Sequence, residues 1–187
     1  VVGQFLQGLS ISQGGHLFDI NYAGGDGNDV VLTKCSRGVV NVNKAKVFCS
    51  IQDAIDDLST ANGHTITVAA GVYNITSTIT VNKSVTINGP KLNIDPRTAA
   101  ALRTPGSIDE AIIHGVGVGN LINITVPDVE LNGLEVRNGT ADLISSPAGA
   151  PVKENVKVRY CIVHNSNSTG DEGMQLRNVE DGGIEYC

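Results

Sequence analysis

An internal repeat near the C-terminal end of the chain constrains its fold more than any other feature. When residues 129–138 are aligned with residues 156–165, apolar residues coincide at four positions and asparagine coincides at 138 and 165. Leu134 aligns with Cys161 in this comparison, and the next copy of the pattern aligns Cys161 with Cys187. A period in the twenties, with three short strands and three turns per period, is typical of a β-solenoid, in which each coil is stabilised by its neighbours.

Short predicted strands extend this pattern over most of the chain. They lie at 65–69, 77–81, 84–88, 111–114, 121–126, 129–131, 134–137, 155–160, 161–164, 173–177 and 183–187. Strands this short and numerous also occur in sandwiches and barrels, but few of the two-residue hairpin turns that those folds need are visible. We therefore predict an all-β fold whose main part, residues 50–187, is a parallel β-helix of about four coils.

Residues 50–61 form the one predicted helix, which we expect to cap the first coil of the stack. Its apolar face comprises Ile51, Ala54, Ile55 and Leu58 at helical spacing. Ser50 and Asp53 resemble a capping box at its start, and Asn62-Gly63 is predicted to end it.

Residues 1–34 are predicted to form a small antiparallel β module, and residues 35–49 a linker with a possible strand at 38–42. Within the module, residues 17–22 alternate apolar and polar side chains, as a half-buried strand does. A turn rich in Gly, Asp and Asn follows at 24–29, and residues 30–33 form the returning strand.

The turn at 24–32 also fits the calcium-binding nonapeptide G-G-x-G-x-D-x-U-x. That motif works through tandem stacking, because one copy supplies only half of each site, and this chain has one copy. A simple turn between two strands is therefore the favoured interpretation. If calcium binds, Asp26 and Asp29 would ligate it through oxygen; no other cofactor is predicted.

The four cysteines, Cys35, Cys49, Cys161 and Cys187, form no C-x-x-C pair, so a zinc site is not expected. A bridge between Cys35 and Cys49 would pin the β module to the capping helix. Cys161 and Cys187 share one inward column of the repeat. They either form a disulfide or remain reduced as small hydrophobic residues, and the coil spacing of about 4.8 Å favours the reduced pair.

Composition limits the partners and the location of the protein. Hydrophobic residues make up 41% and charged residues 17% of the 187 residues, and the formal net charge is −6. An acidic chain without clustered Lys and Arg is not expected to bind nucleic acid, and no apolar run is long enough to span a bilayer. The N-x-S/T rule identifies five glycosylation candidates, Asn74, Asn82, Asn123, Asn138 and Asn167.

Two segments resemble known families. Residues 48–187 resemble the N-terminal half of pectin-lyase-like right-handed β-helix proteins, through a helix at 50–57, a strand closing on Ala-Gly-x-Tyr at 65–73, and a first coil ending in Asn-Gly at 79–89. Residues 4–33 resemble the short β module that ends repeat units of large bacterial surface proteins. The resemblances imply a right-handed β-helix and an extracellular or cell-surface location. The second also implies that the chain, which starts at Val1 without an initiator Met, is part of a longer precursor.

The resemblance to the β-helix family does not bring a catalytic site with it. Its lyases use clustered acids with an Arg or Lys base, and its hydrolases use paired aspartates near Gly-His-Gly, which this chain lacks. We therefore expect a structural surface protein that self-associates through open β-helix ends into a filament or surface layer, or acts in adhesion with surface glycans as possible ligands. The alternative is a carbohydrate-active β-helix, a lyase, hydrolase or glycan-binding module, with its active site in downstream coils.

Overall fold

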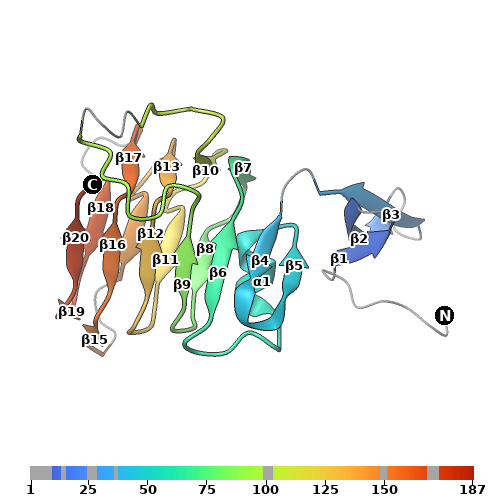
Figure 1. Cartoon of the computed structure of the whole chain (residues 1–187), viewed down its shortest axis with the longest axis horizontal. Helices are drawn as coiled ribbons and strands as arrows, with labels where there is room; N and C mark the ends of the chain where they lie inside the picture. Colours follow the sequence, from blue (N-terminus) through green and yellow to red (C-terminus); the bar gives the residue numbers. More distant parts are fainter. Residues whose placement is uncertain are drawn as a thin grey trace.

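The computed structural model describes residues 10–13, 16–24, 29–35, 38–98, 103–147, 151–167 and 173–187. Over these residues the fold is all-β, with parallel sheets and one short α-helix. At the N-terminal end, β1 (Ser10–Gln13), β2 (His16–Gly24) and β3 (Asp29–Lys34) form an antiparallel sheet, as the alternating pattern of this segment predicts (Figure 1).

Most of the remaining strands belong to three sheets that run the length of the main body (Figure 1). The first contains β4 (Val39–Asn41), β5 (Lys46–Phe48), β6 (Thr65–Val68), β9 (Thr86–Asn88), β12 (Glu130–Asn132), β16 (Lys157–Arg159) and β20 (Gly183–Glu185). The second contains β7 (Gly71–Ile75), β10 (Ala111–Gly115), β13 (Glu135–Arg137) and β17 (Ile162–His164). The third contains β8 (Ile79–Val81), β11 (Ile122–Ile124), β14 (Ile144–Ser146) and β18 (Met174–Leu176).

The chain visits the three sheets in turn, and we call each stretch that contributes one strand to every sheet a coil. From β6 to β20, the corresponding strands of successive coils pair with each other in parallel. Leu131 pairs with Val158, and Val158 pairs with Ile184. These are the same residues that the sequence repeat aligns with one another, so the predicted register is confirmed.

The apolar side chains between the three sheets form the core. Ile66, Ile87, Leu131 and Val158 occupy one column of the first sheet, and all four are buried. Burial of each such side chain is worth about 1.5–3 kcal/mol relative to exposure. Because every contact in a column is between neighbouring coils, the stability of a coil depends on the coil beside it.

The corners between strands repeat as faithfully as the strands do. Asp128, Asn155 and Asp181 recur at one corner with φ of 54°, 56° and 51°, and the Asn155 side chain donates to Asp128 Oδ1 at 3.1 Å. Asn138 and Asn165 occupy another, with φ of 63° and 57°. Asn and Asp tolerate this left-handed conformation better than most residues, because their short side chains bond locally.

The helix is shorter than its sequence pattern predicts. It spans α1 (Ile51–Asp56), with the Ser50 hydroxyl accepting from Asp53 N–H at 3.0 Å, so the predicted N-cap is confirmed. The predicted end at Asn62-Gly63 is wrong. Asp57 has left the helical region with ψ of 132°, and its carboxylate accepts from the Ser59 N–H at 2.9 Å. This local turn competes with the helix, and Leu58, predicted to pack inward, is 98% exposed.

β4 matches the strand predicted at 38–42, but several other strands lie where the sequence patterns predict none. β4 and β5 form an antiparallel hairpin in the segment predicted as a linker, and β4 pairs antiparallel with β6. A 3-10 turn, Val42–Lys44, connects them. β7 and β14 belong to the second and third sheets, and β15 (Lys153–Glu154) pairs in parallel with β19 (Val179–Glu180) beside the stack.

A long connection, the loop 89–110, separates β9 from β10 and is described over 89–98 and 103–110. Figure 1 shows it passing along the stack toward the C-terminal coils before returning to β10. Asn93 N–H donates to Asn132 Oδ1, and the Asn132 amide donates to Asn93 Oδ1, both at 3.0 Å. The guanidinium of Arg97 lies 5.4 Å from the ring centre of Tyr186 in the last coil.

Candidate functional site

The outer surface of the second sheet carries a row of polar side chains at one register position. Asn74, His114, Arg137 and His164 are consecutive partners across β7, β10, β13 and β17. They point outward because the alternate residues of these strands, such as Ile113 and Val136, fill the core. The parallel register therefore places three basic or potentially basic groups one strand spacing apart, about 4.8 Å.

Glu135, two residues before Arg137 in β13, binds two members of this row. Its side chain is fully buried, and Oε1 accepts from Arg137 Nη1 at 3.1 Å and lies 3.0 Å from His164 Nε2. Its other oxygen accepts from the Gly106 N–H in the loop 89–110 at 2.7 Å. A buried carboxylate is costly unless it is paired and hydrogen-bonded, and these three partners meet that requirement.

A second buried ion pair fixes the same loop to the sheet. Arg103 and Glu110 have fully buried side chains and form a two-point contact, at 2.9 Å from Nε to Oε1 and 2.7 Å from Nη2 to Oε2. Arg103 also donates to the carbonyls of Ile94, Leu134 and Tyr160. One guanidinium thus links its own loop to the two coils that contain Leu134 and Tyr160.

We define the charged cluster by six residues: Arg103, Glu110, His114, Glu135, Arg137 and His164. Both of its carboxylates are engaged by a guanidinium, so neither is arranged as a free general base. The half-buried side chains of Arg137 and His164 are 23% and 27% exposed, and His114 is also half-buried. What the cluster can offer a ligand is hydrogen-bond donors and positive charge, which suits carboxylate or sulfate groups.

Sequence reasoning missed this cluster, since the histidines read as scattered turn or surface residues. One signal was present: the alignment of the repeat copies already places Arg137 over His164. His114 could not be found in that way, because the loop 89–110 interrupts the repeat ahead of it. No pattern marks Arg103 or Glu110, whose pairing depends on how that loop folds back.

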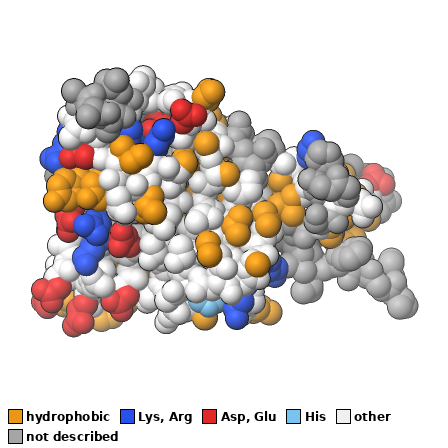
Figure 2. All heavy atoms as spheres, in the orientation of Figure 1, with side chains coloured by type: hydrophobic (Ala, Val, Ile, Leu, Met, Phe, Trp, Pro, Cys, Tyr) orange, Lys and Arg blue, Asp and Glu red, His pale blue; other side chains and the backbone are white. Residues whose placement is uncertain are grey.

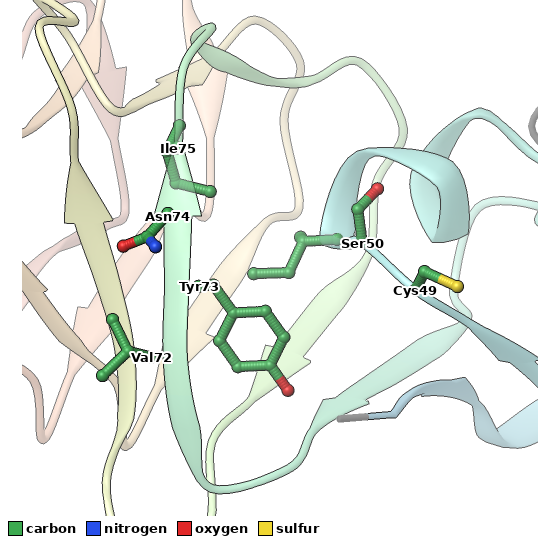
Figure 3. Close-up of a pocket in the computed structure, with 7 residues that line it drawn as sticks. Cys49, Ser50, Val72, Tyr73, Asn74 and Ile75 are labelled. Carbon is green, nitrogen blue, oxygen red and sulfur yellow. The ribbon is translucent and has the colours of Figure 1, made fainter. Parts of the chain in front are cut away.

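A cavity of about 310 Å³ lies between α1 and β7. Figure 3 shows Tyr73 on the side of the strand that faces α1, with Val72 and Asn74 on the opposite side. The Tyr73 hydroxyl donates to the Ala69 carbonyl at 2.9 Å. The lining contains no charged side chain; it consists of Cys49, Ser50, Ile51, Val72, Tyr73, Asn74 and Ile75.

Of the two residues predicted to bind calcium, the structure describes only Asp29. Asp26 lies outside the described residues, and Asp29 is exposed at the start of β3. Over the described ranges, no group of three or more His, Cys, Asp or Glu side chains is arranged to hold a metal ion. Calcium binding at Asp26 and Asp29 stays a prediction.

The cysteines separate into a bridged pair and a free pair. Cys35 and Cys49 form a disulfide with a Cα–Cα distance of 5.3 Å, which joins β3 to the start of α1. Cys161 and Cys187 are free; the first is buried and the second half-buried. The N–H of Cys161 donates to the sulfur of Cys187 at 3.4 Å, so the two residues are in contact.

The five glycosylation candidates differ in exposure. Asn74, Asn82 and Asn167 are exposed. Asn123 lies within β11, where its side-chain oxygen accepts from the Ser145 hydroxyl at 3.5 Å. Asn138 is half-buried at a left-handed corner. The three exposed residues are therefore better placed to carry a glycan than the other two.

The surface also carries an acidic region. Figure 2 shows acidic side chains gathered near β15 and β19, whereas hydrophobic side chains are spread over the body. The exposed acids of this region are Asp128, Glu154, Glu180 and Asp181. Within the described ranges, no helix has the length and apolar character to cross a membrane.

Comparison with known proteins gives one partial similarity. The chain is 51% identical over 49 residues to a cell surface glycoprotein of Methanothermus fervidus. The match covers 26% of this chain and 8% of that protein, so it spans only a small part of the relative's length. No family model matches the chain, and no solved structure matches it.

Proposed function

We propose that the chain is a right-handed parallel β-helix that serves as a structural unit of a cell-surface protein. The observation that carries the proposal is the in-register parallel pairing of all three sheets from coil to coil. Parallel connections within a sheet are right-handed in about 98% of cases, which supports the handedness. The proposed organisation is a module at 1–34, a segment at 35–49 that adds β4 and β5 to the first sheet, and the β-helix at 50–187.

Three observations support a place outside the cell. The partial relative is described as a cell surface glycoprotein. Cys35 and Cys49 are bridged, and disulfides persist mainly in oxidising compartments. Asn74, Asn82 and Asn167 offer exposed acceptor positions for glycans.

The location is tested with an antibody against the purified chain, applied to cells that make the protein. Labelling of intact cells, lost after brief treatment with an external protease, is the expected result. Labelling that requires permeabilised cells would contradict the proposal. An antibody against a cytosolic protein of the same cells controls for leakage.

We propose self-association through strand pairing as part of this function. Among the described strands, β17, β18 and β20 each pair with a neighbour on one side only. Such edges pair readily with other strands, and a head-to-tail contact that does not close grows into a filament. Light scattering of the purified chain should therefore show a mass that rises with protein concentration. A constant monomer mass over a hundredfold concentration range would contradict assembly through these edges.

A second function, adhesion to acidic glycans, is favoured by the charged cluster. The row of His114, Arg137 and His164 presents donors at the spacing of successive coils. A polysaccharide bearing carboxylates could contact several of them at once. We expect galacturonate oligosaccharides to bind in calorimetry, with an affinity that falls as salt is added.

Two matched variants distinguish binding at this surface from nonspecific attraction between charges. Arg137→Gln should weaken binding by about tenfold to a hundredfold, because a charge-assisted contact contributes about 1.5–3 kcal/mol. Arg159→Gln removes the same charge from the first sheet, away from the row, and should leave binding unchanged. Equal effects of both substitutions would contradict a site on the second sheet. Shortening of the oligosaccharide during the measurement would instead support the enzymatic alternative.

A further inference from the structure

Two free cysteines lie one above the other at a corner of successive coils. Tyr160 and Tyr186 occupy the left-handed position of this corner, with φ of 50° and 54°, and their rings stack with centres 4.9 Å apart. Cys161 and Cys187 follow them directly. Since Arg159 pairs with Glu185, the two cysteines fall at the same register position of neighbouring coils.

The sulfur of Cys187 is directed back toward the preceding coil. It accepts the Cys161 N–H at 3.4 Å and lies 3.4 Å from the carbonyl of Val158, which belongs to that coil. The Cys161 sulfur lies 3.3 Å from the Arg159 carbonyl and 3.8 Å from the Leu131 carbonyl. The two cysteines are therefore already in contact across the coil boundary.

The two thiols differ in reactivity. The hydrogen bond from Cys161 lowers the pKa of Cys187 to about 7; burial opposes this change, and the guanidinium of Arg103 assists it. The same hydrogen bond and complete burial raise the pKa of Cys161. Near neutral pH, Cys187 is thus partly a thiolate, and its side chain is half-buried. Cys161 is a protonated thiol that is buried beside it.

The spacing of the fold permits a bond between them. Neighbouring strands lie about 4.8 Å apart, within the range of roughly 4.4–6.8 Å for the Cα atoms of a disulfide. The Cβ atoms must approach to about 3.8 Å, which requires a small local closure of the corner. The stacked tyrosines keep the two corners aligned while that closure occurs.

We propose that Cys161 and Cys187 form an oxidisable dithiol that closes to a disulfide between successive coils, with a low-molecular-weight disulfide as the oxidant. The Cys187 thiolate attacks one sulfur of the oxidant, forms a mixed disulfide and releases one thiolate. Cys161 then loses its proton and attacks the Cys187 sulfur, which releases the second thiolate. In total the protein loses two electrons and two protons, and the oxidant is reduced to two thiols. The inference does not depend on the proposed location or on assembly.

The test treats the folded chain of residues 1–187 with glutathione disulfide and follows intact mass and free thiols. The wild-type chain should lose both of its titratable thiols and retain no glutathione. Non-reducing peptide mapping should then recover the segments containing Cys161 and Cys187 as one linked species. A glutathione adduct that persists on Cys187, an intermolecular dimer, or two unreacted thiols would each overturn the proposal.

Single substitutions separate the roles of the two cysteines. Cys161→Ser should trap glutathione on Cys187, because no second thiol is present to release it. Cys187→Ser should leave Cys161 unmodified, because that thiol is buried and protonated. Circular dichroism confirms that each variant is folded. If one is not, the peptide map of the wild-type chain alone decides the question.

Discussion

At the residue scale, the molecule uses the buried Arg103–Glu110 ion pair and the buried carboxylate of Glu135 to attach an irregular loop to a regular stack. Arg103 and Glu135 each bond to groups from more than one element, so each ties the loop 89–110 to strands of the second sheet or to the corners beside them. Breaking a buried pair leaves one charge without a partner, which costs more than the pair itself contributes.

Arg103→Met should therefore lower the free energy of unfolding by about 3 kcal/mol, since it leaves Glu110 buried and unpaired. The double variant Arg103→Met with Glu110→Leu should recover part of this loss, because no isolated charge remains. Urea unfolding measures both. Arg97→Met is the matched control, since Arg97 pairs with Asp95 on the surface, and it should change stability far less. A double variant less stable than Arg103→Met would contradict the account.

Asp57 gives a pH-dependent prediction. Burial raises the pKa of its carboxyl, but hydrogen bonds from Lys46 and Ser59 outweigh burial and hold the pKa below its usual value of 3.8. A depressed folded-state pKa means that the ionised carboxylate stabilises the fold above pH 3.8. That contribution is lost as the pH falls toward and through the folded-state pKa.

Asp57→Asn should cost about 1 kcal/mol at pH 7, since the amide keeps the turn acceptor and loses the charge. The difference from wild type should shrink as the pH is lowered below 3.8. Asp56→Asn, at an exposed neighbouring position, is the control. A difference between Asp57→Asn and wild type that stays constant from pH 7 to pH 2 would exclude the charge as its source.

At the scale of elements, the corners explain why one position takes different residues in different coils. Gly133 and Tyr160 occupy the same left-handed corner, with φ of 70° and 50°. A Cβ atom on Gly133 would lie 2.4 Å from the Lys91 carbonyl carbon, because the loop 89–110 passes directly over it. The next coil accommodates a tyrosine at that corner.

Gly133→Ala should therefore be more destabilising than the same substitution at Gly63. Gly63 has φ of 82°, and an added Cβ there would meet no atom within 4 Å. We expect Gly63→Ala to cost about 1 kcal/mol from backbone strain and Gly133→Ala about 2 kcal/mol more from overlap. Thermal unfolding of both variants measures the difference; equal losses would show that the loop can move aside.

The sequence predicts strands well where apolar and polar side chains alternate. It predicts them poorly where contacts with the rest of the fold determine which residues are buried. The ladder from β12 to β20 follows from its repeat of apolar positions. β14 could not be predicted, because Ile144, Ser145 and Ser146 are all buried and show no alternation. β7 does alternate, with Gly71 and Tyr73 buried and Val72 exposed, and its pattern could have been used. The helix ends where the Asp57 side chain bonds to the Ser59 N–H. The spacing of apolar residues carries no information about that bond.

At the scale of the whole molecule, the core is continuous from coil to coil, and the charged cluster depends on that continuity. His114, Arg137 and His164 lie in one row only because the register places β10, β13 and β17 side by side. The repeat predicts that Arg137 and His164 are partners in neighbouring strands and that Cys161 and Cys187 lie at the same position of neighbouring coils. It could not predict the buried partners from the loop 89–110, whose path is set by tertiary contacts.

The central claim is that successive coils stack in parallel, in the register that the sequence repeat defines. Nuclear Overhauser spectroscopy on the labelled chain tests it directly, because backbone protons of paired strands lie close together. We predict cross-peaks from the strand of Val158 to the strands of both Leu131 and Ile184, in parallel register. Cross-peaks that instead pair these strands antiparallel, or join Val158 to neither partner, would contradict the account.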